Sequence, residues 1–229
     1  MKPPPPYIAE LHDALEVTLL ATADLGFWRD RLQEEGLVPH DRGGQAELFI
    51  SAVSSRFRGV KFSELSISAA VSDRPDGATR DGFYFFSAFN SSRLFALVER
   101  ICFHTPYRRA RVAVNADSSP SIKVVMSEAI LLHAEKSASS SAIRTSQEMW
   151  EGRIYLPRRR TRKPSKVFFA RISGQTETYA FARGSDIFTP NPNGSAAIRW
   201  LLESQASGVE WQIRRKATHA RSKTYDRPS

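Results

Sequence analysis

The sequence is short of the residues on which much structural and catalytic chemistry depends. Its 229 residues include one cysteine, Cys102, so no internal disulfide bond can form. No apolar segment approaches the roughly 20 residues that span a bilayer, and the N-terminal MKPPPPYIAELH lacks the apolar run of a secretory signal. We therefore expect a protein of the reducing cytoplasm that makes no contact with membranes.

Sequence motifs for cofactors, metals and common nucleophiles are also lacking. The chain has no G-x-G-x-x-G, no Walker loop and no G-x-S-x-G segment. The histidines are scattered without the spacing of metal ligands, so we expect neither a metal site nor a cofactor. They are His12, His40, His104, His133 and His219.

The positive charge is unevenly distributed. The segment RRRTRKPSK (158–166) and the last residues, 214–229, together carry more positive charge than the whole chain's net +9, which leaves the rest of the chain slightly acidic. We therefore predict one domain over residues 1–213 and a basic, disordered tail over 214–229. The loop 158–166 and the tail are also a candidate surface for nucleic acid or another polyanion. The alternative is a solvated surface, because no aromatic residues are interleaved to stack bases.

Strand-like alternation dominates the rest of the chain. Leu65, Ile67, Ala69 and Val71 alternate with polar residues, and similar patterns recur with no regular alternation of strands and helices. About nine strands and about three helices favour a mainly antiparallel α+β or barrel-like domain. Residues 166–172 and 176–181, on either side of Ser-Gly-Gln, predict a hairpin.

The segment 83–114 predicts a strand, a helix, a turn and a second strand in succession. Its first strand is apolar on both faces, which indicates that both faces are covered. Asn90, Ser91 or Ser92 caps the helix, and Pro106 excludes Thr105 from it. The apolar positions of the helix share one face, which we expect to pack on the strand with Cys102 as a small core residue. They are Leu94, Leu97, Val98, Ile101 and Cys102.

Three segments within residues 15–114 resemble the acetoacetate decarboxylase-like superfamily. FRGVKFSELSISAAV (57–71) is similar to a family strand that carries a glutamate, and FYFFSAFNSSRLFA (83–96) to the following strand and the start of the central helix. ERICFHTPYRRARV (99–112) resembles the signature that holds the family's catalytic lysine. The resemblance implies a cone-like β-barrel with peripheral helices.

The chain departs from the family at the position on which decarboxylation depends. Family decarboxylases form a Schiff base on a lysine that follows the proline, with a second lysine beside it that keeps the first amine neutral. Here Pro106 is followed by Tyr107 and Arg108. A phenol forms no iminium, and arginine stays protonated. We therefore expect no lysine-dependent decarboxylation, and the residues leave open whether the protein is an enzyme.

The resemblance assigns a pocket to a few residues, and each has a simpler reading. Glu64 and Tyr107 are the catalytic candidates, although Glu64 also suits a solvated strand face and Tyr107 a packing role. Arg108 and Glu99 are ligand-binding candidates, although Glu99 lies off the apolar helix face and suits a solvated carboxylate.

Two further residues near the turn complete the ligand-binding candidates. Arg108, Arg109 and Arg111 cannot all be buried without acids, so at least one should reach solvent or a ligand anion. His104 follows the helix, where it is either a ligand-binding residue or a cation favoured by the helix dipole.

The preferred function is binding of a small organic acid or carbonyl compound. Arginine would hold the carboxylate and tyrosine the carbonyl, and any turnover would use proton transfer by Glu64 or Tyr107. The alternatives are polyanion binding through the loop and tail, and a non-catalytic homo-oligomer whose site has decayed.

Overall fold

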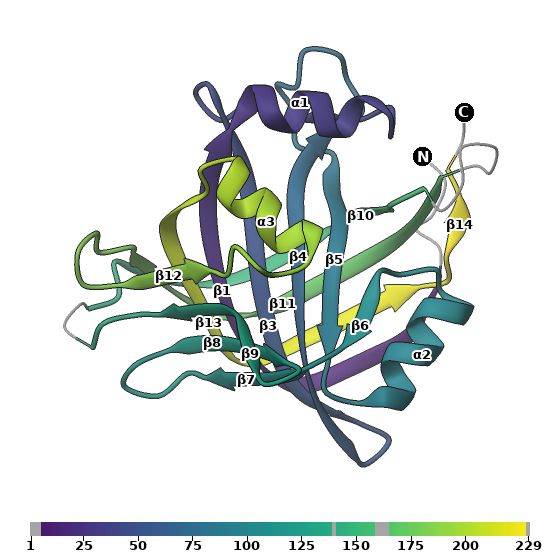
Figure 1. Cartoon of the computed structure of the whole chain (residues 1–229). Helices are drawn as coiled ribbons and strands as arrows, with labels where there is room; N and C mark the ends of the chain where they lie inside the picture. The colour runs from purple at the N-terminus through teal and green to yellow at the C-terminus, as the bar shows by residue number, and fades with distance from the viewer. Residues whose placement is uncertain (1–5, 139–140, 159–164, 228–229) are drawn as a thin grey trace.

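The structure, a computed structural model, describes residues 6–138, 141–158 and 165–227 (Figure 1). Its helices are α1 (Leu25–Gln33), α2 (Arg93–Cys102) and α3 (Ala196–Glu203). Its strands are β1 (Tyr7–Asp24), β2 (Val38–Pro39), β3 (Gln45–Phe57), β4 (Val60–Ser72), β5 (Gly82–Asn90), β6 (Tyr107–Arg109), β7 (Arg111–Asn115), β8 (Ser121–Met126), β9 (Ala129–Glu135), β10 (Arg144–Leu156), β11 (Lys166–Ala180), β12 (Ile187–Pro190), β13 (Ser207–Ser222) and β14 (Tyr225–Asp226). None of the helices in these ranges is long and apolar enough to cross a membrane.

Seven of the strands close into a ring, as expected for the cone-like α+β barrel. The order around the ring is β1, β3, β4, β5, β10, β11 and β13, which returns to β1. All neighbours are antiparallel except β5 and β10. Strand β5 pairs with β10 over Gly82–Tyr84 and with β6 over Ala88–Asn90. Strand β6 therefore lies beside β5 at the end of the ring where β10 has diverged.

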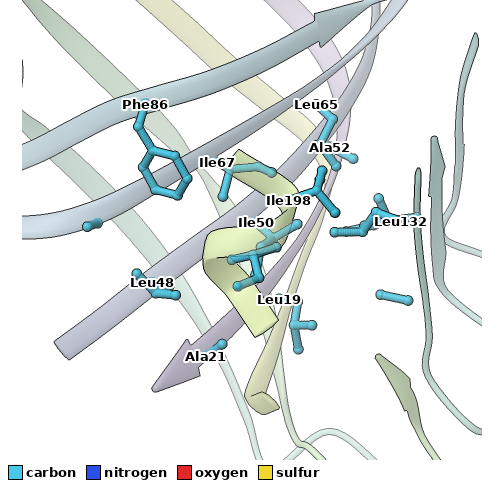
Figure 2. Close-up of a cluster of buried hydrophobic side chains, with 14 of the residues drawn as sticks. Leu19, Ala21, Leu48, Ile50, Ala52, Leu65, Ile67, Phe86, Leu132 and Ile198 are labelled. Carbon is cyan, nitrogen blue, oxygen red and sulfur yellow. The ribbon is translucent and has the colours of Figure 1, made fainter. Parts of the chain in front are cut away.

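The main hydrophobic core lies on the outer face of the ring. Alternate residues of β1, β3 and β4 pack against α1, α3 and a second sheet of order β12-β9-β8-β7. Figure 2 shows Leu19, Ile50 and Ile67 of three adjacent strands meeting Ile198 of α3 and Leu132 of β9. This burial explains why β1, β3 and β4 are apolar at every second position.

The opposite face of the same strands is polar and faces the interior of the ring. On β4 the residues that alternate with the core are Glu64, Ser66 and Ser68, and on β1 they include Glu16 and Thr18. Thr18 and Glu16 are almost fully buried. The interior of the barrel therefore holds hydrogen-bonding groups and charges, which is the environment in which a ligand site can form.

Helix α2 is turned the opposite way from the orientation that its sequence predicts. Leu94 is 63% exposed and Ile101 60%, and Cys102 is also exposed, whereas Ala96 is buried. The prediction of Cys102 as a core residue is therefore wrong. The buried side of α2 is set by Phe95, whose ring packs edge-on against Phe57 and Phe62 of the β3–β4 hairpin. An apolar stripe shows where a helix can bury surface. In α2 the contacts of Phe95 with Phe57 and Phe62 determine which side is buried.

The C-terminal part of the chain corrects two predictions. Residues 214–222 are not a disordered tail, because β13 runs from Ser207 to Ser222 and pairs with both β1 and β11. The predicted hairpin at Ser-Gly-Gln is a single strand, β11, which passes through Gly174 with a register shift against β13. Gly174 has φ +154°, so glycine here lets the strand bend without turning back.

Candidate functional site

A row of side chains crosses five neighbouring strands of the ring in register. Asn90 of β5 pairs with Glu64 of β4, and Glu64 pairs with Val53 of β3. Val53 pairs with Glu16 of β1, which pairs with Arg214 of β13. Since directly paired residues point to the same face of a sheet, the row places two carboxylates on the interior face with only Val53 between them.

The first carboxylate, Glu64, forms a pair with Tyr107. The Tyr107 hydroxyl donates a hydrogen bond to Glu64 Oε2 over 2.8 Å, and Asn90 Nδ2 donates to the same oxygen over 3.2 Å. Tyr107 is buried against Phe85, Ala88 and Ala96. The sequence-predicted catalytic pair is thus in direct contact, although its members are 43 positions apart in the chain.

Burial changes the acidity of both groups in the pair. Burial raises the pKa of Glu64 above its ordinary value of 4.5; the carboxylate of Glu99 adds to the effect, and the hydrogen bond from Tyr107 opposes it. Burial, together with the charge of Glu64, raises the pKa of Tyr107 well above 10. The phenol therefore stays protonated as a hydrogen-bond donor, and Glu64, with its pKa raised by burial, is the member of the pair that gains and loses a proton more readily.

Arg221 of β13 lies close to this pair. Its Nη1 donates to both carboxylate oxygens of Glu99 on α2, over 2.6 and 2.5 Å. Its guanidinium lies 4.4 Å from the ring centroids of Phe103 and Phe168. The Nε and Nη2 atoms of Arg221 are buried and have no hydrogen-bond partner among the described residues. Those two N–H groups form one edge of the guanidinium, which is the edge that binds a carboxylate through two hydrogen bonds.

The second carboxylate of the row, Glu16, lies in a buried network of its own. It accepts hydrogen bonds from Arg214 Nη1 (3.1 Å) and Thr18 (2.9 Å), and its other oxygen lies 3.0 Å from His219 Nε2. Burial by itself would raise the pKa of Glu16, but Arg214 and His219 outweigh burial and lower it to about 2. Glu16 is therefore a charged anchor for Arg214, which also reaches Glu148 of β10.

The remaining predicted residues divide between this region and the surface. Glu99 is partly buried and paired with Arg221 and Thr105, so the reading of it as a solvated carboxylate is wrong. Arg108 and Arg109 are exposed, and neither bonds Glu64 or Tyr107. The ligand-binding roles of Arg108, Arg109 and His104 stay predictions; His104 is partly buried, with φ +61°.

The sequence reasoning missed Arg221, His219, Arg214 and Glu16. The first three lie in residues taken for a tail, where basic composition hid the alternation of a strand. One signal was available: Glu16 is an acid inside the apolar run LEVTLLATA, and a carboxylate in a buried strand requires a buried cation elsewhere in the chain.

Two cavities of the structure are lined by residues other than Glu64 and Tyr107. One, of about 430 Å³, includes Arg56 and Lys61, and the other, of about 460 Å³, includes Tyr179 and Arg215. Within the described ranges, no three His, Cys, Asp or Glu side chains gather closely enough to hold a metal ion.

No family model matches the sequence, and no curated protein is similar to it at a significant level. Solved structures do match. An acetoacetate decarboxylase from Legionella pneumophila superposes with a TM-score of 0.66 at 12% identity, covering 100% of this chain and 92% of that one.

The chain has the acetoacetate decarboxylase-like fold. An acetoacetate decarboxylase-like enzyme from Sphingomonas wittichii RW1 matches with a TM-score of 0.57 at 10% identity, over 96% of this chain and 92% of that chain. The enduracididine biosynthesis enzyme MppR, complexed with the condensation product of pyruvate and imidazole 4-carboxaldehyde, matches with a TM-score of 0.59 at 10% identity, over 96% and 88%. At these identities the likeness establishes the fold.

Proposed function

We propose that the protein binds a small oxygenated organic acid inside the ring, beside Glu64, Tyr107 and Arg221, without forming a covalent bond to it. The observation that carries this proposal is the position of Arg221. Two buried N–H groups of one guanidinium that find no partner among the described residues, close to a phenol and a carboxyl of raised pKa, suit a ligand that has both a carboxylate and a carbonyl or hydroxyl oxygen.

Arg221 is the residue that we propose to hold the ligand carboxylate. One of its nitrogens is used by Glu99, and the rings of Phe103 and Phe168 restrict the plane of the guanidinium. A buried N–H group without a partner costs free energy, so a ligand that accepts hydrogen bonds from Nε and Nη2 regains it. Arg221 thus takes the role predicted for Arg108 and Arg109, which are exposed.

The Glu64–Tyr107 pair would hydrogen-bond the carbonyl or hydroxyl oxygen of the ligand. The single O–H of Tyr107 donates to Glu64, so it is available to the ligand only when Glu64 is protonated and donates to the phenol oxygen instead; when ionised, Glu64 accepts. If the protein turns its ligand over, Glu64 is the group that transfers the proton. A similar ligand class appears in the condensation product of pyruvate bound to MppR.

Covalent capture of a ketone by an amine is not part of this proposal. Pro106 is followed by Tyr107 and Arg108, and Lys61 and Lys123 are both exposed. Treatment with acetoacetate and borohydride should therefore leave the mass of the intact protein unchanged. A stable mass increase that maps to a lysine would contradict this expectation.

Ligand binding is tested by a thermal-shift screen against keto acids, hydroxy acids and aromatic acids, followed by calorimetry on the best compound. The informative variant is Arg221→Lys, which keeps a cation beside Glu99 and removes the free Nε and Nη2 donors. We expect it to fold and to bind about tenfold more weakly, the loss typical of one charge-assisted hydrogen bond.

Two further variants complete this test. Tyr107→Phe should also weaken binding, and Arg171→Gln is the matched control because Arg171 pairs with Glu10 on the same sheet. Wild-type affinity in Arg221→Lys, or the absence of any hit in the screen, would refute the proposal.

The alternative is binding of nucleic acid or another polyanion through residues 158–166 and the C-terminal segment. Residues 159–164 lie outside the described part of the chain. Arg214 and Arg221 are mostly buried and paired with acids, so they are not available to phosphates. Salt-dependent retention on heparin that is lost on replacing Arg158, Arg159 and Arg160 by glutamine would support this alternative.

A homo-oligomer and a cytoplasmic location also stay predictions. Light scattering on the eluting protein tests the first of them. Fractionation of the cells that produce the protein tests the second.

A further inference from the structure

A cavity of about 430 Å³ lies beside the hairpin that joins β3 to β4, apart from the Glu64–Tyr107 pair. It is bounded by the end of β3, the start of β4 and the irregular part of β1. Its lining residues are His12, Asp13, Ser54, Ser55, Arg56 and Lys61.

Two cations face each other across this hairpin. Arg56 of β3 and Lys61 of β4 are directly paired residues in the ladder. Like charges at such a position repel, and no acid among the described residues forms an ion pair with either of them. The contrast is with Arg42 and Arg80, which are both paired with Glu47. Arg56 and Lys61 are therefore adjacent positive charges that no ion pair among the described residues neutralises.

Ser55 also lines this cavity but does not turn its hydroxyl into it. Ser55 and Arg56 are consecutive residues of β3, so their side chains point to opposite faces of the strand. The Oγ of Ser55 is buried on the face away from Arg56. The Ser55 side chain is therefore an internal control for the charges of Arg56 and Lys61.

We propose that this cavity binds the phosphate group of a small phosphorylated compound. A phosphate has several strong acceptor oxygens, which suits the paired charges of Arg56 and Lys61. The cavity lies within the size range of small-molecule pockets and exceeds what one phosphate fills, which leaves room for an organic part. This proposal stands whether or not an organic acid binds at Glu64.

The cavity is also lined by one acid, whose negative charge should weaken the binding of an anion. Removing that charge should therefore strengthen binding. This acid is Asp13, which has φ +52°, a conformation that asparagine also adopts with ease. His12 Nε2 lies 3.9 Å from Glu10 Oε2. Asp13→Asn should therefore bind phosphate more tightly than the wild type, without a change in the backbone.

Binding is measured by calorimetry and thermal shift with inorganic phosphate and with glycerol 3-phosphate, against sodium chloride of equal ionic strength, at mildly alkaline pH. We expect saturable binding of both probes, and tighter binding of glycerol 3-phosphate. Arg56→Gln and Lys61→Gln should each weaken binding about tenfold, the loss expected for one charge-assisted hydrogen bond. Ser55→Ala should leave binding unchanged, because the Ser55 side chain points to the opposite face of β3.

The matched control is Arg58→Gln. Arg58 is a cation of the same hairpin that packs over the Phe57 ring and does not line the cavity. Without phosphate, Lys61→Gln should be at least as stable as the wild type, because it removes a repulsion, so loss of folding does not confound the result. Equal weakening by Arg58→Gln and Lys61→Gln would overturn the proposal, as would probes that bind no better than chloride.

Discussion

At the scale of single residues, the position after Pro106 brings a phenol into contact with a buried carboxyl group. Tyr107 stands there, buried, with its hydroxyl on Glu64. A phenol whose pKa is raised well above 10 by burial stays a donor. Under the proposed function this phenol orients the ligand, and any proton transfer at the site is made by Glu64.

The raised pKa of Glu64 makes a prediction about pH and stability. The folded protein holds the Glu64 proton more tightly than the unfolded chain does, mainly because of burial. That contribution to the free energy of unfolding is fully present below the ordinary pKa of 4.5 and is lost as the pH rises through the folded pKa. Glu64→Gln removes this titration and keeps an oxygen for Tyr107 to bond.

Chemical denaturation of both proteins from acid to mildly alkaline pH measures this difference. We expect Glu64→Gln to gain stability relative to the wild type as the pH rises above 4.5. The exposed acid Asp117 supplies a control, since Asp117→Asn should show no comparable trend. A difference between wild type and Glu64→Gln that stays constant with pH would show that Glu64 titrates normally.

At the scale of elements, α2 shows that an amphipathic pattern does not by itself identify the buried face. Its apolar stripe is exposed, and its inner side carries Phe95, Ala96 and Glu99. Glu99 points inward because Arg221 lies there, and the ion pair between them joins α2 to β13. Helix α2 therefore places the carboxylate of Glu99 beside the candidate site and does not bury its apolar stripe in the core.

The orientation of α2 is tested by the same substitution on its two sides. Leu94 is 63% exposed and Ala96 is 6% exposed. Leu94→Gln should change the free energy of unfolding by less than about 0.5 kcal/mol. Ala96→Gln places a larger polar group against Phe85 and Tyr107 and should cost about 1–3 kcal/mol. Urea denaturation measures both, and the reverse order would mean that the apolar stripe is covered.

Strand β13 makes a second prediction at this scale. Strand β13 pairs with β1 and β11 along its length. A chain that ends at Ile213 loses the second half of this strand, including Arg214 and Arg221. Glu16 and Glu99 would then be left without their cations, which is costly for buried charges. We expect this truncated chain to show no cooperative unfolding by circular dichroism. A chain that ends at Arg227 is the control, and a normal transition in the shorter chain would mean that 214–229 is dispensable.

At the scale of the whole molecule, the sequence predicted the barrel but not which side chains contact one another in its interior. Strand β4 was evident from Leu65 and Ile67, and Ser92, one of the three predicted caps, begins α2. Alternation of apolar and polar residues distinguishes the two faces of a strand. It does not say whether the polar face lies in solvent or in the interior of a barrel.

The long-range pairs were beyond sequence reasoning for a different reason. Arg221 and Glu99 are 122 positions apart, and Arg214 and Glu16 are 198 apart. Nothing local in a basic C-terminal segment marks which arginine meets which acid. Glu64 and Tyr107 were found only because a resemblance placed them in one pocket.

The ion pairs of Glu16 connect strands on different sides of the ring, so they predict how the whole molecule responds to acid. Arg214 joins Glu16 of β1 to Glu148 of β10, and the pKa of Glu16 is lowered to about 2 by Arg214 and His219 against the effect of burial. A lowered pKa means that the stabilisation is present above the ordinary value of 4.5 and is lost as the pH falls toward 2. The pKa difference corresponds to roughly 3 kcal/mol of unfolding free energy lost over that window.

Glu16→Gln has no such titration, so its stability should approach that of the wild type as the pH falls. Near neutral pH it should be less stable by about 3–5 kcal/mol, because Arg214 is then buried without a full counter-charge. Glu10→Gln is the control on the same strand, because Glu10 is exposed enough for its pairs with His12 and Arg171 to contribute little. Denaturation at a series of pH values measures all three proteins. Parallel acid profiles for wild type and Glu16→Gln would show that the charge of Glu16 does not hold the ring together.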